Sequence, residues 1–186
     1  MIFTETRLKG AFLLDLEPHE DRRGFFARTF CAREFSEHGL RPAIVQCSLS
    51  FTRQGGTLRG MHYQEPPHTE TKLVRCTHGA IYDVIIDLRP GSATYLQHIG
   101  LELTAHNRRA LYVPELFAHG FQTLVDDTEV IYQMSEFYAA GHARGLRYND
   151  PALGLTWPLP VTVLSEADAA WPLLLQPAAA NSKRPA

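Results

Sequence analysis

The chain has 186 residues, of which 45% are hydrophobic and 20% charged, and its formal net charge at pH 7 is −2. This size and composition predict one soluble domain over residues 1–175, followed by a flexible C-terminal tail over 176–186. The small net charge excludes a global attraction to nucleic acid or to an anionic membrane, and no apolar run is long enough for a membrane helix.

The predicted elements are mostly strands. A short helix over Ala32–His38 comes first and should end at Gly39, which suits a left-handed C-cap. Strands rich in β-branched and aromatic residues then recur between Gly, Pro and Asp turns, a spacing typical of an antiparallel sandwich or barrel. They cover Thr57–Gln64, Lys72–Cys76, Ala80–Leu88, His98–Thr104, Ala110–Val113, Gly120–Val125 and Glu129–Tyr138. A second short helix, capped by Ser165, should run through Ala170.

Cysteine usage favours a reducing compartment. Cys31, Cys47 and Cys76 are odd in number and lack CxxC spacing, which indicates neither a disulfide framework nor a thiolate zinc site. The N-terminal segment has no basic and apolar regions of the kind found in targeting signals. We therefore expect a cytoplasmic protein.

The densest group of chemically active residues lies in the segment 55–64, where a glycine turn leads into a strand that carries Arg59, His62 and Tyr63. A lone histidine is more often a structural group than a catalytic one. Lys72 opens the next strand, and His119 follows apolar neighbours that would partly bury it. Because buried cations and imidazoles cost free energy unless paired, these residues together suggest a polar-lined interior.

Two further residues have plain structural explanations. The Asp126-Asp127 turn would pair Gly120–Val125 with Glu129–Tyr138 as a hairpin and bring Tyr132 near His119, where ordinary packing explains the tyrosine. Asp168 stands in the first turn of a helix capped by Ser165, where a carboxylate favours the positive end of the helix.

The positions of Arg59 and His62 leave one question open. Strict alternation along the strand places the two side chains on opposite faces. Either Gly60 allows a β-bulge, or the two residues serve different surfaces.

Six ordered motifs together resemble the dTDP-4-dehydrorhamnose 3,5-epimerase family. They are Asp21–Phe26, Leu58–Gln64, Lys72–Arg75, Pro114–Phe121, Asn149–Pro151 and Leu164–Asp168. The resemblance implies a mostly β fold of the cupin type, a jelly-roll sandwich or barrel with a few short peripheral helices. It also implies a homodimer that needs no metal or organic cofactor and acts on a sugar linked to a nucleoside diphosphate.

The same resemblance implies residue roles. His62 would be the base, Asp168 its partner, Tyr132 the acid on the opposite sugar face, and Lys72 the cation that stabilises the enolate. Substrate-binding positions would be Arg23 and Arg59 at the diphosphate, His119 near the sugar, Tyr138 stacked on the base, and Arg28, Gln46 and Ser48 at the nucleotide.

Four positions depart from the family pattern, namely Arg28, Ser48, Ala143 and Ala167. All four positions contact the nucleotide in the family. At position 28, an arginine donates hydrogen bonds where the family's glutamate accepts them. The expected reaction is conversion of dTDP-4-dehydro-6-deoxy-D-glucose to dTDP-4-dehydro-L-rhamnose. Recognition of a CDP-, UDP- or GDP-linked sugar stays open as an alternative.

Three other functions compete with double epimerisation. One is inversion of C3 or C5 alone. A second is a metal-dependent cupin, which needs a His-x-His pair and a carboxylate, whereas His62 is followed by Tyr63 and Gln64. The third is a sugar-nucleotide binding protein without catalysis, which would have no reason to combine an acid with a base.

Overall fold

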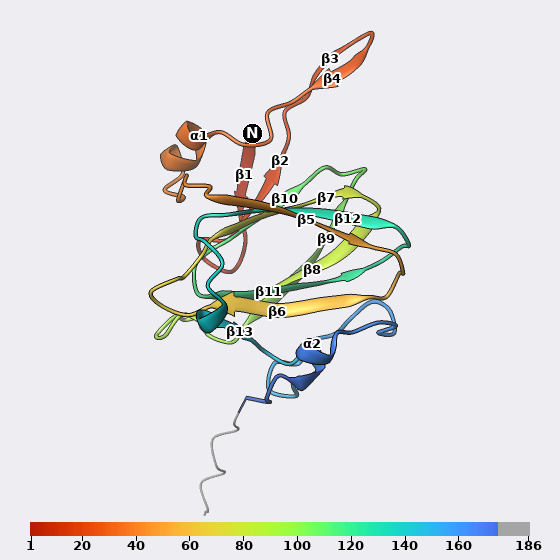
Figure 1. Ribbon diagram of the computed structural model, residues 1–186. Coiled ribbons are helices and arrows are strands. Elements are labelled where there is room, and N and C mark those ends of the chain that lie inside the picture. The colour runs from red at the N-terminus through yellow and green to blue at the C-terminus, as the bar shows by residue number, and fades with distance from the viewer. Residues whose placement is uncertain (175–186) are drawn as a thin grey trace, which may run out of the picture.

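A computed structural model describes residues 1–174 of the chain, so the predicted tail over 176–186 lies outside the described residues. Two antiparallel sheets pack face to face, with the first above the second in Figure 1. The first sheet has six strands in the order β1 (Ile2–Glu5), β2 (Phe12–Asp15), β10 (Ala110–Val113), β7 (Lys72–His78), β12 (Thr128–Met134) and β5 (Gln46–Thr52). The second has five, in the order β13 (Ala143–Gly145), β6 (Leu58–Gln64), β11 (Phe117–Thr123), β8 (Ala80–Asp87) and β9 (His98–Thr104).

The remaining elements are short and lie outside the sandwich. Strands β3 (His19–Asp21) and β4 (Gly24–Phe26) form a separate hairpin near α1 (Ala32–Glu37), while α2 (Glu166–Ala170) lies beneath the second sheet (Figure 1). A single 3-10 turn, η1 (Ala140–His142), precedes β13. The prediction of a mostly β sandwich with a few short peripheral helices is confirmed.

Both predicted helices are present. The first ends before Gly39, which has a φ of +71° as a left-handed C-cap requires. The second is capped as expected, because the Ser165 side chain accepts a hydrogen bond from the backbone N–H of Asp168 at 3.0 Å. No helix within residues 1–174 is long and apolar enough to span a membrane.

An apolar core fills one part of the space between the sheets. Val74, Leu111 and Val130 of the first sheet meet Ile85 and Phe121 of the second, and all five are at most 1% exposed. A second cluster packs α1 against the outer face of the first sheet, and a third packs the segment from Leu146 to Trp157 against the outer face of the second. Each sheet is therefore covered by apolar packing on its outer face as well as on its inner face.

Strand β5 was not predicted, although its sequence alternates. Gln46, Ser48 and Ser50 line an interior cavity, whereas Leu49 and Phe51 lie on the outer face and are about half exposed. In an ordinary sandwich strand the apolar side chains face the interior and the polar ones face the solvent. In β5 this arrangement is reversed, because the interior next to β5 is a cavity and not an apolar core. Strands β1, β2, β3, β4 and β13 were also missed, each being only three or four residues long.

The predicted hairpin between Gly120–Val125 and Glu129–Tyr138 is wrong. The first strand belongs to β11, which pairs with β6 and β8, and the second to β12, which pairs with β5 and β7. The Asp126-Asp127 turn therefore carries the chain from one sheet to the other. Tyr132 still lies near His119, with ring centroids 6.2 Å apart, because the two sheets face each other.

A β-bulge decides the relation between Arg59 and His62. His62 pairs with His119 and Arg59 pairs with Phe121, so that Gly60 and Met61 of β6 oppose the single residue Gly120 of β11. Gly60 has a φ of +130°, which favours glycine. The extra residue turns both Arg59 and His62 toward the cavity between the sheets.

The bulge also needs a glycine on the neighbouring strand. A Cβ on Gly120 would lie 2.6 Å from Met61 Sδ and 2.8 Å from the Arg59 carbonyl oxygen. We expect Gly120→Ala to lower the free energy of unfolding by about 1–3 kcal/mol through overpacking, as measured by urea denaturation. Gly141→Ala is the control, since a Cβ at that position would have no atom of the described residues within 4 Å. Equal stability of the two variants would contradict the proposed need for close approach.

Candidate functional site

A cavity of about 790 Å³ opens between the two sheets. Its lining comes from β5, β7 and β12 of the first sheet, from β6, β11 and β13 of the second, and from the segment that contains α2. All but two of the predicted site residues line it: Gln46, Ser48, Arg59, His62, Lys72, His119, Tyr132, Tyr138 and Asp168. Residues that lie far apart in the sequence thus meet in one place.

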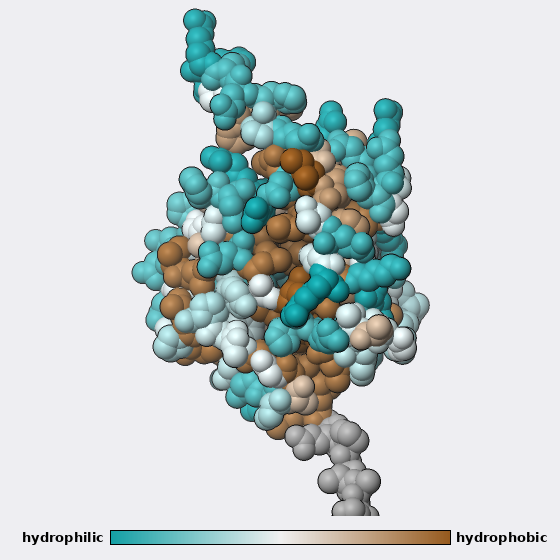
Figure 2. Space-filling model, turned by 180° about the vertical axis from the view of Figure 1, so that it is seen from behind, coloured by the Kyte–Doolittle hydropathy of each residue, from teal (hydrophilic) through white to brown (hydrophobic). Residues whose placement is uncertain are grey.

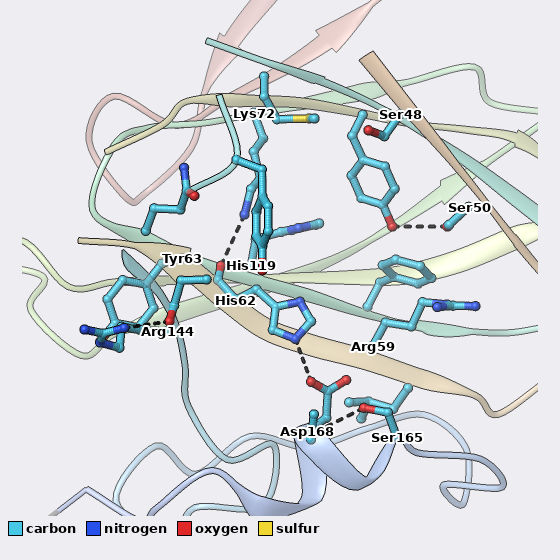
Figure 3. Close-up of a pocket in the computed structure, with 18 of the residues that line it drawn as sticks. Ser48, Ser50, Arg59, His62, Tyr63, Lys72, His119, Arg144, Ser165 and Asp168 are labelled. Carbon is cyan, nitrogen blue, oxygen red and sulfur yellow. Dashed lines mark hydrogen bonds and ion pairs between the residues drawn. The ribbon is translucent and has the colours of Figure 1, made fainter. Parts of the chain in front are cut away.

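His62 and Asp168 form a hydrogen-bonded pair at the floor of this cavity (Figure 3). The His62 Nε2 lies 2.6 Å from Asp168 Oδ1, and the His62 side chain is about half exposed while that of Asp168 is 8% exposed. A carboxylate accepts only, so Nε2 carries the hydrogen of the neutral imidazole. Nδ1 then holds the lone pair, which makes it the basic nitrogen.

Asp168 is held in place from three sides. Its backbone N–H donates to Ser165, its Oδ1 accepts from His62, and its Oδ2 accepts from the backbone N–H of Gly60 at 3.3 Å. Burial alone would raise the pKa of this carboxyl, but the hydrogen bond and charge of His62 and the hydrogen bonds of Gly60 and Ser165 hold the pKa below its ordinary value. Asp168 therefore has two roles. Its backbone N–H is bound by the capping Ser165, as the sequence indicates, and its carboxylate orients His62.

Lys72 extends from β7 toward the His62 backbone (Figure 3). Its Nζ lies 3.3 Å from the His62 carbonyl oxygen and 3.0 Å from Glu70 Oε1. The sequence reasoning missed Glu70, which also lines the cavity. Its position two residues before Lys72, on the same side of an extended chain, is the signal that could have identified it.

Tyr132 approaches the cavity from the opposite sheet to His62. Its hydroxyl lies 3.2 Å from Ser50 Oγ, a contact that the sequence reasoning did not foresee. Burial is the main cause that raises the pKa of this phenol well above its ordinary value, although the hydrogen bond with Ser50 lowers it. The phenol is therefore protonated at neutral pH and can donate a proton.

His119 is paired behind the cavity. Its Nε2 lies 2.8 Å from Oδ1 of the fully buried Asp83 on the neighbouring strand β8, and its own side chain is only 5% exposed. The expected burial of His119 is thus present, together with a carboxylate partner that the sequence did not reveal. Such a pair fixes the orientation of the ring that faces the cavity.

Two glutamines anchor the segment that carries Tyr138. Gln46 Oε1 accepts the Tyr138 backbone N–H at 2.6 Å, and Gln64 Oε1 accepts that of Ala139 at 2.7 Å. Gln64 Nε2 also donates to the carbonyl of Phe137 at 3.2 Å. The exposed Tyr138 ring is thereby held beside the cavity by a fixed backbone.

Arg23 and Arg28 do not line the cavity of their own chain. Arg23 follows β3 in the projecting hairpin, where its side chain is 84% exposed and paired with Asp21. Arg28 pairs with Glu34 of α1 at 3.1 Å. The space-filling view shows the hairpin as a narrow arm that stands away from the body of the molecule (Figure 2).

Across residues 1–174, His, Cys, Asp and Glu side chains form no group of three or more that could hold a metal ion. The imidazoles in the cavity, those of His62 and His119, are each paired with a separate aspartate. Both arrangements suit proton transfer and ring orientation.

The chain is similar to known proteins along most of its length. Residues 5–176 match the family model described as dTDP-4-dehydrorhamnose 3,5-epimerase. The protein of that name from Sinorhizobium fredii is 44% identical over 95% of this chain and 91% of its own. Among solved structures, the Bacillus anthracis enzyme of the same name, with TDP and PPi bound, has a TM-score of 0.90 and 42% identity over 93% of this chain and 99% of its own.

A third comparison includes a sugar nucleotide. The dTDP-6-deoxy-D-glucose-3,5-epimerase of Legionella pneumophila, in complex with dTDP-4-keto-L-rhamnose, has a TM-score of 0.86 and 34% identity over 92% of both chains. These similarities confirm the predicted resemblance and, with it, the cupin-type jelly roll.

The lowered pKa of Asp168 generates a prediction about stability. Because the fold favours its ionised form, this carboxylate contributes stability above its ordinary pKa of 3.8, and the contribution is lost as the pH falls through the lowered value. We expect the wild type to be more stable than Asp168→Asn near neutral pH, and the difference to shrink as the pH falls below about 4. Urea denaturation of both proteins across this range tests it, and a constant difference would contradict it.

Proposed function

The chain belongs to the dTDP-4-dehydrorhamnose 3,5-epimerase family, and we propose that it inverts C3 and C5 of dTDP-4-dehydro-6-deoxy-D-glucose to give dTDP-4-dehydro-L-rhamnose. One observation supports the chemistry above all others. The paired His62 and Asp168 enter the cavity from the side of the second sheet, while Tyr132 enters from the first. A sugar ring between them would have a base on one face and an acid on the other.

The first step is removal of a proton beside the ketone. The C4 carbonyl acidifies the hydrogens on C3 and C5, so a neutral imidazole can abstract each in turn. Nδ1 of His62 is the basic nitrogen, since Nε2 donates to Asp168. Asp168 keeps this tautomer and stabilises the imidazolium that forms.

The electrons left by the proton collect on the C4 oxygen as an enolate. A cation close to this oxygen lowers the barrier, because it interacts more strongly with the enolate than with the ketone. Lys72 supplies that cation, since its ammonium lies 3.3 Å from the His62 carbonyl oxygen and both residues line the same cavity.

Inversion then requires a proton from the opposite face. Return of the proton by His62 would only regenerate the substrate. Tyr132, which burial keeps protonated, is the donor, and its contact with Ser50 holds the hydroxyl in place. The enolate collapses to the ketone as the new C–H bond forms. Before the second centre reacts, the imidazolium of His62 releases its proton to water and the phenolate of Tyr132 takes one up.

Arg59 and Tyr138 bind the nucleotide end of the substrate. A guanidinium matches phosphate oxygens, and Arg59 is oriented by its hydrogen bond to Thr52 Oγ1 at 3.1 Å. Tyr138 offers an exposed ring for stacking on the thymine base. Gln46, Ser48 and His119 complete the contacts to the nucleotide and sugar.

A second copy of the chain would supply Arg23. This residue is exposed on the hairpin, outside its own cavity, together with the exposed apolar residues Phe25 and Phe26. We propose a homodimer in which the hairpin of one protomer reaches the cavity of the other and places Arg23, and Arg28 near it, at the diphosphate and nucleotide. The free cysteines Cys31, Cys47 and Cys76 fit a cytoplasmic location.

The base assignment is tested with His62→Ala. We expect this variant to lose exchange of the C5 hydrogen in deuterated water by at least about a hundredfold, with binding of dTDP unchanged. His106→Ala, which changes an exposed histidine outside the cavity, is the control. Deuterium at both C3 and C5 of the wild-type product checks double inversion. Undiminished exchange in His62→Ala would refute the mechanism.

The shared site is tested by mixing a variant with weakened substrate binding and a variant without the base. Arg23→Ala should weaken substrate binding by about 1.5–3 kcal/mol, the strength of a charged hydrogen bond, and His62→Ala should lack the base. In a mixed dimer, one of the two cavities would contain both His62 and the partner's arginine. Random exchange between equal amounts makes about half of the dimers mixed, so about a quarter of all sites should be restored. Activity at low substrate concentration is measured before and after exchange. No recovery would show that Arg23 does not act across the dimer.

A further inference from the structure

Glu70 is a largely shielded carboxylate that lines the cavity and that the proposed mechanism does not use. Its side chain is 12% exposed and that of Lys72 is 11% exposed, with Lys72 Nζ 3.0 Å from Glu70 Oε1. An ion pair so shielded from water is costly to build unless its geometry is well satisfied. The surroundings of both groups indicate what the pair does.

The ammonium of Lys72 has three N–H donors. One is directed at Glu70 Oε1, and a second at the carbonyl oxygen of His62, 3.3 Å away. These two acceptors restrict rotation about the last bond of the side chain. The third N–H is thereby left for the cavity that His62 and Lys72 both line.

Glu70 is itself held by a neighbour. Its Oε2 accepts a hydrogen bond from Gln64 Nε2 at 3.3 Å, and Gln64 is only 3% exposed. The Gln64 amide is itself fixed, because its Oε1 accepts from the Ala139 backbone N–H at 2.7 Å. Its two N–H donors are shared among Glu70 and the carbonyl oxygens of His68 at 3.0 Å and Phe137 at 3.2 Å. The carboxylate is therefore anchored, and it can impose a direction on Lys72.

A lysine side chain has about 2 kcal/mol of rotamer entropy, so an unrestrained ammonium would spend little time in one orientation. A displacement of about 1 Å in a catalytic group can cost about a hundredfold in rate. Lys72 therefore gains from a fixed acceptor that does not itself contact the substrate.

We propose that Glu70 is a positioning residue that aims the ammonium of Lys72 at the C4 oxygen of the sugar. This inference rests on the proposed function, because it requires Lys72 to stabilise the enolate. Glu70 acts through Lys72 alone: its Oε1 orients the ammonium, and its Oε2 is occupied by Gln64.

The test is a double-mutant cycle on Glu70 and Lys72, read as C5 hydrogen exchange in deuterated water by NMR. Glu70→Ala should lower the exchange rate about tenfold to a hundredfold, with little change in KM. Glu70→Gln keeps an acceptor oxygen and should stay within about threefold of the wild type. In the Lys72→Ala background, Glu70→Ala should cause no further loss, since the group that it positions is absent.

Glu129→Gln is the control, because the Glu129 carboxylate accepts a hydrogen bond from the Thr77 hydroxyl on β7 and does not line the cavity. Thermal unfolding of each variant verifies that it is folded. An equal loss from Glu70→Ala with and without Lys72 would overturn the proposal, as would full activity of Glu70→Ala. Failure of the proposed function would look different, because His62→Ala, measured in parallel, would then retain exchange.

Discussion

The site depends on one irregularity in strand pairing. Because Gly60 and Met61 oppose Gly120 alone, side chains three positions apart on β6 enter the same cavity. A regular strand would send Arg59 and His62 to opposite faces and separate the phosphate-binding cation from the base. The backbone N–H of Gly60 is bound by Asp168, whose other oxygen holds His62. One carboxylate thus stabilises both the bulge and the base.

The interior of the sandwich is divided into an apolar part and a polar part. The apolar part, built around residues such as Ile85 and Phe121, holds the sheets together. In the polar part, three basic side chains are paired with carboxylates: His62 with Asp168, His119 with Asp83, and Lys72 with Glu70. Buried charges without partners would cost several kcal/mol each, so the pairing makes a polar cavity compatible with a stable fold.

The same pairing gives the proposed reaction its asymmetry. Asp168 holds His62 in the tautomer that leaves a basic nitrogen for the cavity, whereas Tyr132 offers a phenol that burial keeps protonated. One side of the cavity thus provides a proton acceptor and the other a proton donor, as abstraction on one face and donation on the other require. Since the two residues belong to opposite sheets, the distance between the sheets sets the space available for the sugar ring.

Sequence patterns alone were enough to predict the class of fold, the family and the members of the site that lie in recognisable motifs, such as Leu58–Gln64 and Lys72–Arg75. Local chemistry suffices for these, because turn residues, β-branched runs and a capping serine act over a few positions. The folded structure was needed to show which distant groups meet. It placed β11 and β12 in different sheets, showed that Gly60 forms a bulge, and gave Asp83 and Glu70 their partners. Sheet exchange, bulges and buried ion pairs arise from contacts between segments far apart in the chain, which no local pattern encodes.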